Sequence, residues 1–213
     1  VTCFCGCFIM AASSRICPGI VASSIYTLLQ QDRQIDAFTV STPADFPPAA
    51  LSEAEEKAFT EKLAALQKAL SAGQPASLEL TLAEINALVA RAPDLGHGTY
   101  QGLVRFTGTD PEHNRLLADI SLPINPLPFS GKPMRYLVGK AVYQVEVGEA
   151  GPDARIVDIE APGKTIPQGF IESQQTWTWV APYHEKEELA GALKKLRSAR
   201  VTPGGLALST QPE

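Results

Sequence analysis

The chain has 213 residues, of which 45% are hydrophobic and 19% are charged, and its formal net charge at pH 7 is −5. This length accommodates one domain with an appendage, and the composition is too apolar for an intrinsically disordered protein. Proteins that bind nucleic acids usually carry a basic face, so the acidic balance argues against a nucleic-acid partner.

The cysteines are confined to the N-terminal part of the chain, as Cys3, Cys5, Cys7 and Cys17. Structural zinc sites pair Cys-x2-4-Cys with a second cysteine pair or with histidines at a defined spacing. The sequence offers no second pair, and its histidines are not spaced as metal ligands. We therefore expect no metal and no other cofactor.

The first thirty residues differ from the rest of the chain. Residues 3–29 are apolar or small with one charge, Arg15, and are long enough to cross a bilayer as a helix. A cation in the middle of such a span is unfavourable. If translation starts at Met10, Arg15 becomes the basic flank of an apolar region over residues 16–29, as in a signal-anchor. We expect residues 1–30 to form this transmembrane signal-anchor; a buried helix of the globular domain is the alternative.

A linker is expected over residues 31–50, because the prolines in Ser41-Thr42-Pro43 and Phe46-Pro47-Pro48 favour extended backbone. Residues 51–213 then form a single α+β domain outside the cytoplasm. Arg15 on the near side of the apolar region is typical of an N-terminus that stays in the cytoplasm.

Two capping boxes predict the first two helices of the domain. Ser52 and Glu55 form a Ser-x-x-Glu box in front of an apolar stripe, and Gly73 suits the end of that helix. Thr81 and Glu84 repeat the box directly after a short strand. Further helices are expected over residues 166–175 and 185–198.

Alternation of apolar and polar residues predicts strands over 78–80, 104–107, 116–122, 136–147 and 157–161, and a hairpin over 201–208. Short turns between the middle strands favour one antiparallel sheet with one apolar face. The prolines of residues 123–133 indicate a loop or a sheet edge. The expected fold class is therefore α+β, with an N-terminal membrane anchor followed by an antiparallel sheet packed with several helices.

Three short motifs resemble a known family. Leu80-Thr81-Leu82-Ala83-Glu84-Ile85-Asn86-Ala87-Leu88 is similar to the strand and Thr/Ser-x-x-Glu-Ile/Val-Asn-x-Leu helix of membrane-anchored bacterial envelope proteins of the YpmS-like, DUF2140-type group. Arg135-Tyr136-Leu137-Val138-Gly139 resembles Arg-Tyr-Leu-Asn-Gly of related proteins, with Val138 in place of Asn, and residues 157–167 resemble the end of their next strand. The resemblance implies an uncharacterised protein of the bacterial cytoplasmic membrane, with a curved sheet similar to half of a tubular lipid-binding module. It implies no catalytic residues.

Candidate contact residues follow from the strand motif and from the densest aromatic cluster. Arg135 and Tyr136 are candidates for a lipid head group or a protein partner, with a structural role at a strand start as the alternative. Aromatic side chains favour a membrane interface or a lipid groove, with core packing as the alternative. The six candidates are Arg135, Tyr136, Phe170, Trp177, Trp179 and Tyr183.

The sequence contains neither a Gly-x-Ser-x-Gly elbow nor a phosphate-binding glycine loop, so we expect no enzyme. The first hypothesis is an envelope protein that binds a lipid or acyl chain in an apolar groove between a concave sheet and the helix over residues 52–71. The second is a membrane-anchored scaffold with a filled core, which presents a sheet edge or residues 177–183 to another envelope protein. A continuous apolar cavity favours the first hypothesis, and a solid interior favours the second.

Overall fold

A computed structural model describes residues 33–47, 49–90, 100–124, 132–176, 178–180 and 187–211. The expected signal-anchor over residues 1–30 lies outside this part of the chain, as do Trp177 and Tyr183. Among the described residues, no helix combines the length and the apolar character that a membrane span requires.

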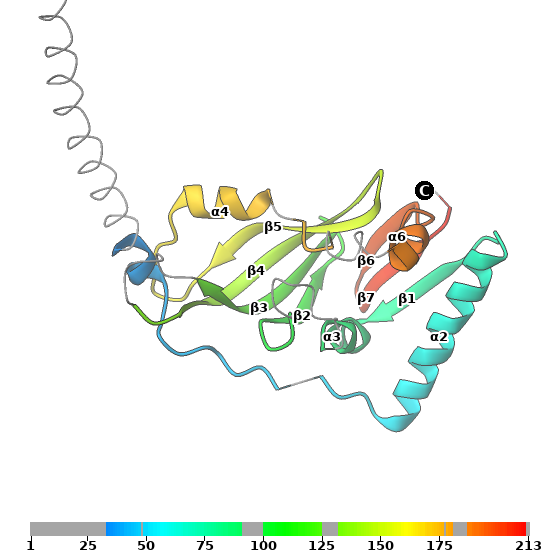
Figure 1. The fold of residues 1–213 in the computed structure, drawn as a ribbon, viewed down its shortest axis with the longest axis horizontal. Helices are drawn as coiled ribbons and strands as arrows, with labels where there is room; N and C mark the ends of the chain where they lie inside the picture. Colours follow the sequence, from blue (N-terminus) through cyan, green and yellow to red (C-terminus); the bar gives the residue numbers. More distant parts are fainter. Residues whose placement is uncertain are drawn as a thin grey trace, which may run out of the picture.

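The chain is α+β, as the sequence predicted, and its strands form two antiparallel sheets (Figure 1). The larger sheet has the order β2-β3-β4-β5, and the smaller one has the order β1-β7-β6. The strands of the larger sheet are β2 (Val104–Asp110), β3 (Arg115–Ile124), β4 (Arg135–Gly148) and β5 (Gly151–Glu160). Those of the smaller sheet are β1 (Ser77–Thr81), β6 (Ser198–Thr202) and β7 (Gly205–Ser209).

Both expected capping boxes are present. Helix α2 (Glu53–Ser71) begins with reciprocal hydrogen bonds between Ser52 and Glu55, and Gly73 follows it with a φ of 65°. Helix α3 (Leu82–Ala90) begins in the same way, because the Thr81 N–H donates to the Glu84 carboxylate at 2.8 Å and the Glu84 N–H donates to the Thr81 hydroxyl at 3.2 Å. Local sequence therefore sets both helix starts.

The prediction of one sheet was wrong, because β1 pairs with β7 near the other end of the chain. Leu78 lies opposite Leu208, and no short-range pattern encodes such a pairing. Three boundaries also differ. Strand β5 begins at Gly151, six residues before the expected start, because its first half continues the hairpin with β4. Strand β3 continues through Pro123, which is tolerated because β2 pairs with β3 only as far as Ile120. The last helix, α6 (Glu187–Leu193), is shorter than expected, because Ser198 already belongs to β6.

The first core cluster fills the inner face of the four-stranded sheet. Ile120, Leu137 and Ile156 are each 0% exposed, and Tyr143 is 1% exposed. This face is covered by α4 (Gln168–Gln175), by β6 and by Phe38 from the N-terminal segment. The space above the sheet is therefore occupied by side chains of the protein itself.

A second, smaller cluster joins α2 and α3 to β1. It consists of Phe59, Leu78, Leu80 and Ile85. Helix α2 therefore packs on the three-stranded sheet, whereas the lipid-binding hypothesis places it over a concave sheet. Figure 1 shows α2 beyond β1, at the opposite end of the molecule from the first described residues.

Part of the expected linker is packed against the domain. Residues 33–38 are helical, and Phe38 and Thr39 are buried. Val40 forms an antiparallel β-bridge with Tyr136, in which each backbone N–H donates to the other residue's carbonyl at 2.8 Å. The following residues 41–47 and 49–50, here called the strap, run along the domain to α2 (Figure 1). The Ala44 N–H of the strap donates to the Ser121 hydroxyl at 3.0 Å.

Candidate functional site

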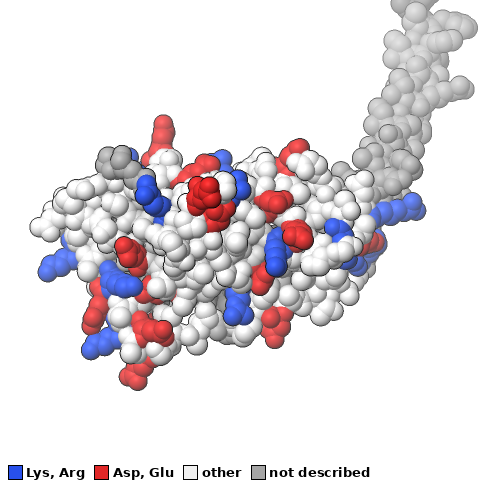
Figure 2. All heavy atoms as spheres, turned by 180° about the vertical axis from the view of Figure 1, so that it is seen from behind, with Lys and Arg blue, Asp and Glu red and all other residues white. Residues whose placement is uncertain are grey.

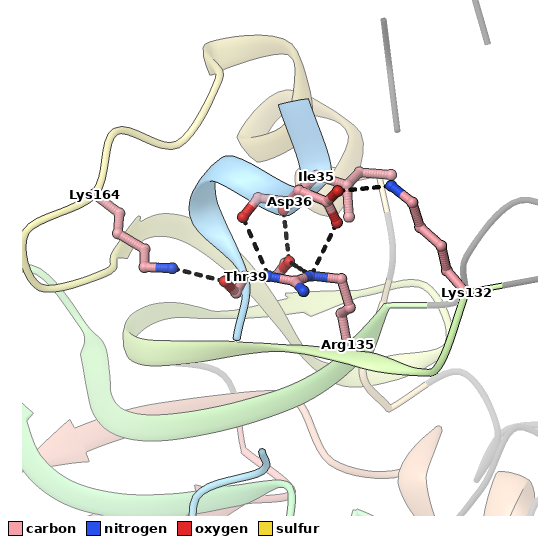
Figure 3. Close-up of polar contacts among 6 residues, drawn as sticks. All are labelled: Ile35, Asp36, Thr39, Lys132, Arg135 and Lys164. Carbon is pink, nitrogen blue, oxygen red and sulfur yellow. Dashed lines mark hydrogen bonds and ion pairs between the residues drawn. The ribbon is translucent and has the colours of Figure 1, made fainter. Parts of the chain in front are cut away.

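The N-terminal segment is fixed to the sheet by a polar cluster that we call the clasp: Asp36, Thr39, Lys132, Arg135 and Lys164 (Figure 3). Its members come from three places, namely the helical turn at residues 33–39, the residues 132–135 that lead into β4, and the loop after β5. The Asp36 carboxylate accepts from Lys132 Nζ at 2.6 Å and lies 3.2 Å from Arg135 Nε.

Arg135 makes most of the remaining contacts of the clasp. It donates to the Thr39 hydroxyl at 2.7 Å and to the backbone carbonyls of Thr39 at 2.9 Å and Asp36 at 3.2 Å. Lys164 Nζ donates to the same Thr39 carbonyl at 2.6 Å. Thr39 closes the helical turn by donating its hydroxyl to the Ile35 carbonyl at 2.5 Å. The geometry therefore holds the start of β4 and the N-terminal segment together.

The clasp carries an excess of positive charge. The cluster contains three cations and one carboxylate, so its net charge is +2. The hydrogen bond from Lys132, reinforced by the charges of Lys132 and Arg135, holds the pKa of Asp36 below its usual value despite partial burial. Asp36 therefore stays ionised at neutral pH.

Of the predicted contact residues, Arg135 and Tyr136 lie at the start of β4 as expected. The Arg135 side chain is 23% exposed and is engaged within the clasp, and Tyr136 is half-buried beside Val40. The structure thus gives Arg135 the structural role that the sequence left open as an alternative.

The two described aromatic candidates pack on the first core cluster. The ring of Phe170 lies 5.0 Å from that of Phe38, and Trp179 lies 4.7 Å from Tyr100 and 5.4 Å from Tyr143. Tyr143 Oη and Trp179 Nε1 are buried and have no hydrogen-bond partner among the described residues. Burial, together with the nearby Tyr100, raises the pKa of Tyr143 well above its usual value.

An open groove of about 520 Å³ lies between the strap, α3 and β2. Asn86 lines it and joins α3 to the edge strand, since its amide donates to the Phe106 carbonyl and accepts from the Phe106 N–H, both at 2.8 Å. The lining is mixed. Its apolar part includes Phe46, Pro47, Ala83, Val89 and Val104, and its polar part includes Asn86, Gln101, Arg105 and Thr107.

Glu84 on α3 is the one buried carboxylate among the described residues, at 6% exposed. Burial raises its pKa, but hydrogen bonds from Lys62 and Thr81 outweigh that effect and leave the pKa below its usual value. The Lys62 ammonium lies 2.8 Å from the carboxylate. Glu84 therefore joins α2 to α3 as an ionised cap and ion-pair partner.

The described ranges contain no group of three or more side chains able to hold a metal ion. His113 lies in the turn between β2 and β3, with Nδ1 2.9 Å from the Asp110 carboxylate, while His97 and His184 fall outside the described residues.

Sequence reasoning missed the clasp partners and the groove. Lys132 and Arg135 meet their partners across 96 residues of chain, and Lys164 across 125. No local motif encodes such contacts. The groove residues Ala83 and Asn86 carried a signal, since both belong to the motif that resembles the envelope-protein family.

Compared with protein-family models, curated proteins and solved structures, the chain has no match.

Proposed function

We propose that the chain is a non-enzymatic, membrane-tethered interaction module, which holds an extended segment of a partner protein in the groove between the strap, α3 and β2. The observation that carries the proposal is the filled core. Ile120, Leu137 and Ile156 fill the inner face of the four-stranded sheet, so we place the ligand in a surface groove, the one at the edge of this sheet. This arrangement corresponds to the scaffold hypothesis.

The chemistry of the groove suits a polypeptide. Asn86 already satisfies the backbone groups of Phe106 on this edge, so we propose that side-chain contacts hold the extended chain in the groove. Phe46 and Val89 offer apolar contact, and Gln101, Arg105 and Thr107 offer hydrogen bonds for amide groups. The strap already lies along the same groove as extended chain.

The polar clusters of the domain also support binding rather than reaction. The clasp, the Glu84–Lys62 pair and the Asn86 amide each connect two separate parts of the chain. Their charges and hydrogen bonds are therefore used to hold elements in place. We accordingly propose that the domain has no catalytic centre.

The proposed location is the bacterial cytoplasmic membrane, with one span over residues 1–30 and the domain outside the cytoplasm. Support comes from the apolar character of residues 16–29 and from the resemblance to the YpmS-like group. The described domain begins at residue 33, directly after this stretch.

Lipid binding is a second candidate, favoured by the apolar side chains of the same groove. Phe46, Val89 and Val104 lie along it, and each buried CH2 of an acyl chain contributes roughly 0.8 kcal/mol. In this version the groove, rather than the core, takes the acyl chain.

Site-specific photocrosslinking in living cells separates the candidates. A photoreactive residue replaces Thr107, which is exposed in the groove, or Gln67 on the exposed face of α2 as the control position. We expect a discrete protein adduct at Thr107 that disappears when Ala83→Trp fills the groove and persists with Ala64→Trp on α2.

An adduct that contains only lipid would select the second candidate. Equal adducts at Thr107 and Gln67, or a Thr107 adduct that is insensitive to Ala83→Trp, would contradict any use of the groove.

A further inference from the structure

The loops and turns of the four-stranded sheet itself carry opposite charge at its two ends. At one end lie residues 33–40, 132–136 and 161–167, with four cations (Arg33, Lys132, Arg135 and Lys164) and one carboxylate (Asp36), a net charge of +3. At the other end lie the turns at residues 110–115 and 146–155, with five carboxylates and two arginines, a net charge of −3. The segment over residues 194–200 packs beside these turns and adds four cations. We call the first set of residues the basic end and the two turns the acidic end.

The separation between the ends is large compared with the range of electrostatics. Strand β4 runs from Arg135 at the basic end to Gly148 at the acidic end, which corresponds to about 40 Å of extended chain. The Debye length in physiological salt is about 8 Å. A charged surface that meets the basic end therefore does not feel the acidic end.

The basic end also exposes an apolar side chain. Met134 is 38% exposed and lies between Lys132 and Arg135 in the sequence. Exposed apolar side chains flanked by cations are typical of surfaces that lie on anionic bilayers. Figure 2 shows Lys and Arg side chains on the surface at this end, where the first described residues lie.

We propose that the basic end is a membrane-docking surface, on which Arg33, Lys132, Met134 and Lys164 contact a bilayer that contains anionic phospholipids. The proposal rests on the proposed membrane tether and adds the orientation of the domain and the lipid class.

The position of the chain argues for a bilayer as the occupant. Residue 33 lies at the basic end, only a few residues after the apolar stretch over 16–29, so a tether in the membrane brings this end to the head groups. The cations are also spread over three chain segments, and three of them hold the clasp while partly exposed. A surface with cations spread in this way can contact several lipid head groups at the same time. The acidic end then points away from the anionic surface.

Lysine acetylation of the full chain in vesicles tests this orientation. The chain is reconstituted into vesicles of phosphatidylcholine, or of an equal mixture of phosphatidylcholine and phosphatidylglycerol, and flotation first establishes membrane association. A short pulse of a membrane-permeant acetylating reagent is followed by mass spectrometry. Lys132 and Lys164 report on the basic end, and Lys57 and Lys68 on the exposed face of α2 are internal controls.

We expect Lys132 and Lys164 to be acetylated roughly fivefold more slowly in the anionic vesicles, since each basic residue near such a surface gains about that factor in association. Lys57 and Lys68 should not change. High salt should remove the difference, because it shortens the Debye length to about 3 Å at 1 M.

Two exposed apolar residues, one just before β4 and one within it, allow a matched pair of variants to be compared. Met134→Asp places a carboxylate at the basic end and should abolish most of the protection, whereas Val147→Asp, at 37% exposure near the acidic end, should leave it unchanged. Both sites are exposed, so neither variant should impair folding.

Flotation distinguishes a failure of the docking surface from a failure of the membrane tether. A chain that floats with both vesicle types but shows equal acetylation rates in them overturns the docking surface and leaves the tether standing. Protection that survives high salt, or that Val147→Asp removes as fully as Met134→Asp, also overturns it. A chain that floats with neither vesicle type overturns the tether and the docking surface together.

Discussion

Asn86 gives the sharpest test of how the groove is built. Its side chain substitutes for a neighbouring strand at the edge of β2, because it exchanges two hydrogen bonds with the backbone of Phe106. Asn86→Ala removes both bonds and leaves a half-buried N–H and a half-buried carbonyl on the edge strand. We expect α3 to separate more easily from the four-stranded sheet.

The magnitude follows from three contributions. Each neutral hydrogen bond contributes about 1 kcal/mol net, and the two unpaired groups of Phe106 add up to about 1 kcal/mol, because water reaches them only in part. Alanine favours the helix over asparagine by about 0.6 kcal/mol, which offsets part of the loss. The free energy of unfolding should therefore fall by about 2 kcal/mol, which lowers Tm by about 4–8 °C for a chain of this size.

Urea unfolding of the full chain in a mild detergent, followed by circular dichroism, measures this change. Asn86→Asp should lose as much, because its second carboxylate oxygen faces the Phe106 carbonyl. Gln67→Ala truncates an exposed amide on α2 and should stay within about 0.5 kcal/mol of the parent chain. If Asn86→Ala stays within that same margin, the amide does not hold the strand edge and the reasoning is wrong.

Three further changes test the packing and the ion pairs. Gly139→Ala should strongly destabilise the domain, because its Cβ would clash with the Glu160 carbonyl oxygen. Gly191→Ala in α6 meets open space and should be neutral or stabilising by up to about 1 kcal/mol. Thermal unfolding should show a large fall in Tm for the first variant and no fall for the second. Both Asn114→Ala and Asn114→Gly remove the side chain that is bonded to Val145, Ala199 and Val201. Asn114→Ala should be less stable than Asn114→Gly by about 1 kcal/mol, because only glycine accepts a φ of 56° without strain. Equal urea midpoints for the two variants would contradict this. The pKa values of Asp36 and Glu84 lie below their ordinary values near 3.8 and 4.5. The stability that these two carboxylates contribute should therefore be fully present above pH 4.5 and be lost as the pH falls through their folded-state pKa values. The double variant Asp36→Asn, Glu84→Gln should show a flatter dependence of Tm on pH, and an unchanged slope would exclude these carboxylates as its cause.

The sequence determined the elements whose signals are local. Ser52 with Glu55 and Thr81 with Glu84 set two helix starts, because a capping side chain reaches a backbone N–H only three residues away. Alternation of apolar residues gave the strands of the larger sheet, because neighbouring residues of a strand point to opposite faces. These signals, summed along the chain, predicted the α+β class.

Tertiary structure decided what those elements meet. The division into two sheets depends on β1 pairing with β7, and the groove depends on Asn86 reaching β2 across 20 residues. The clasp joins residues about a hundred positions apart, so Arg135, a candidate for an external ligand by sequence, is engaged by Asp36 and Thr39. Contacts of this kind form only when whole helices and strands pack together. The residues next to a side chain in the sequence do not show whether it meets such a distant partner or faces solvent, so sequence patterns do not predict these contacts.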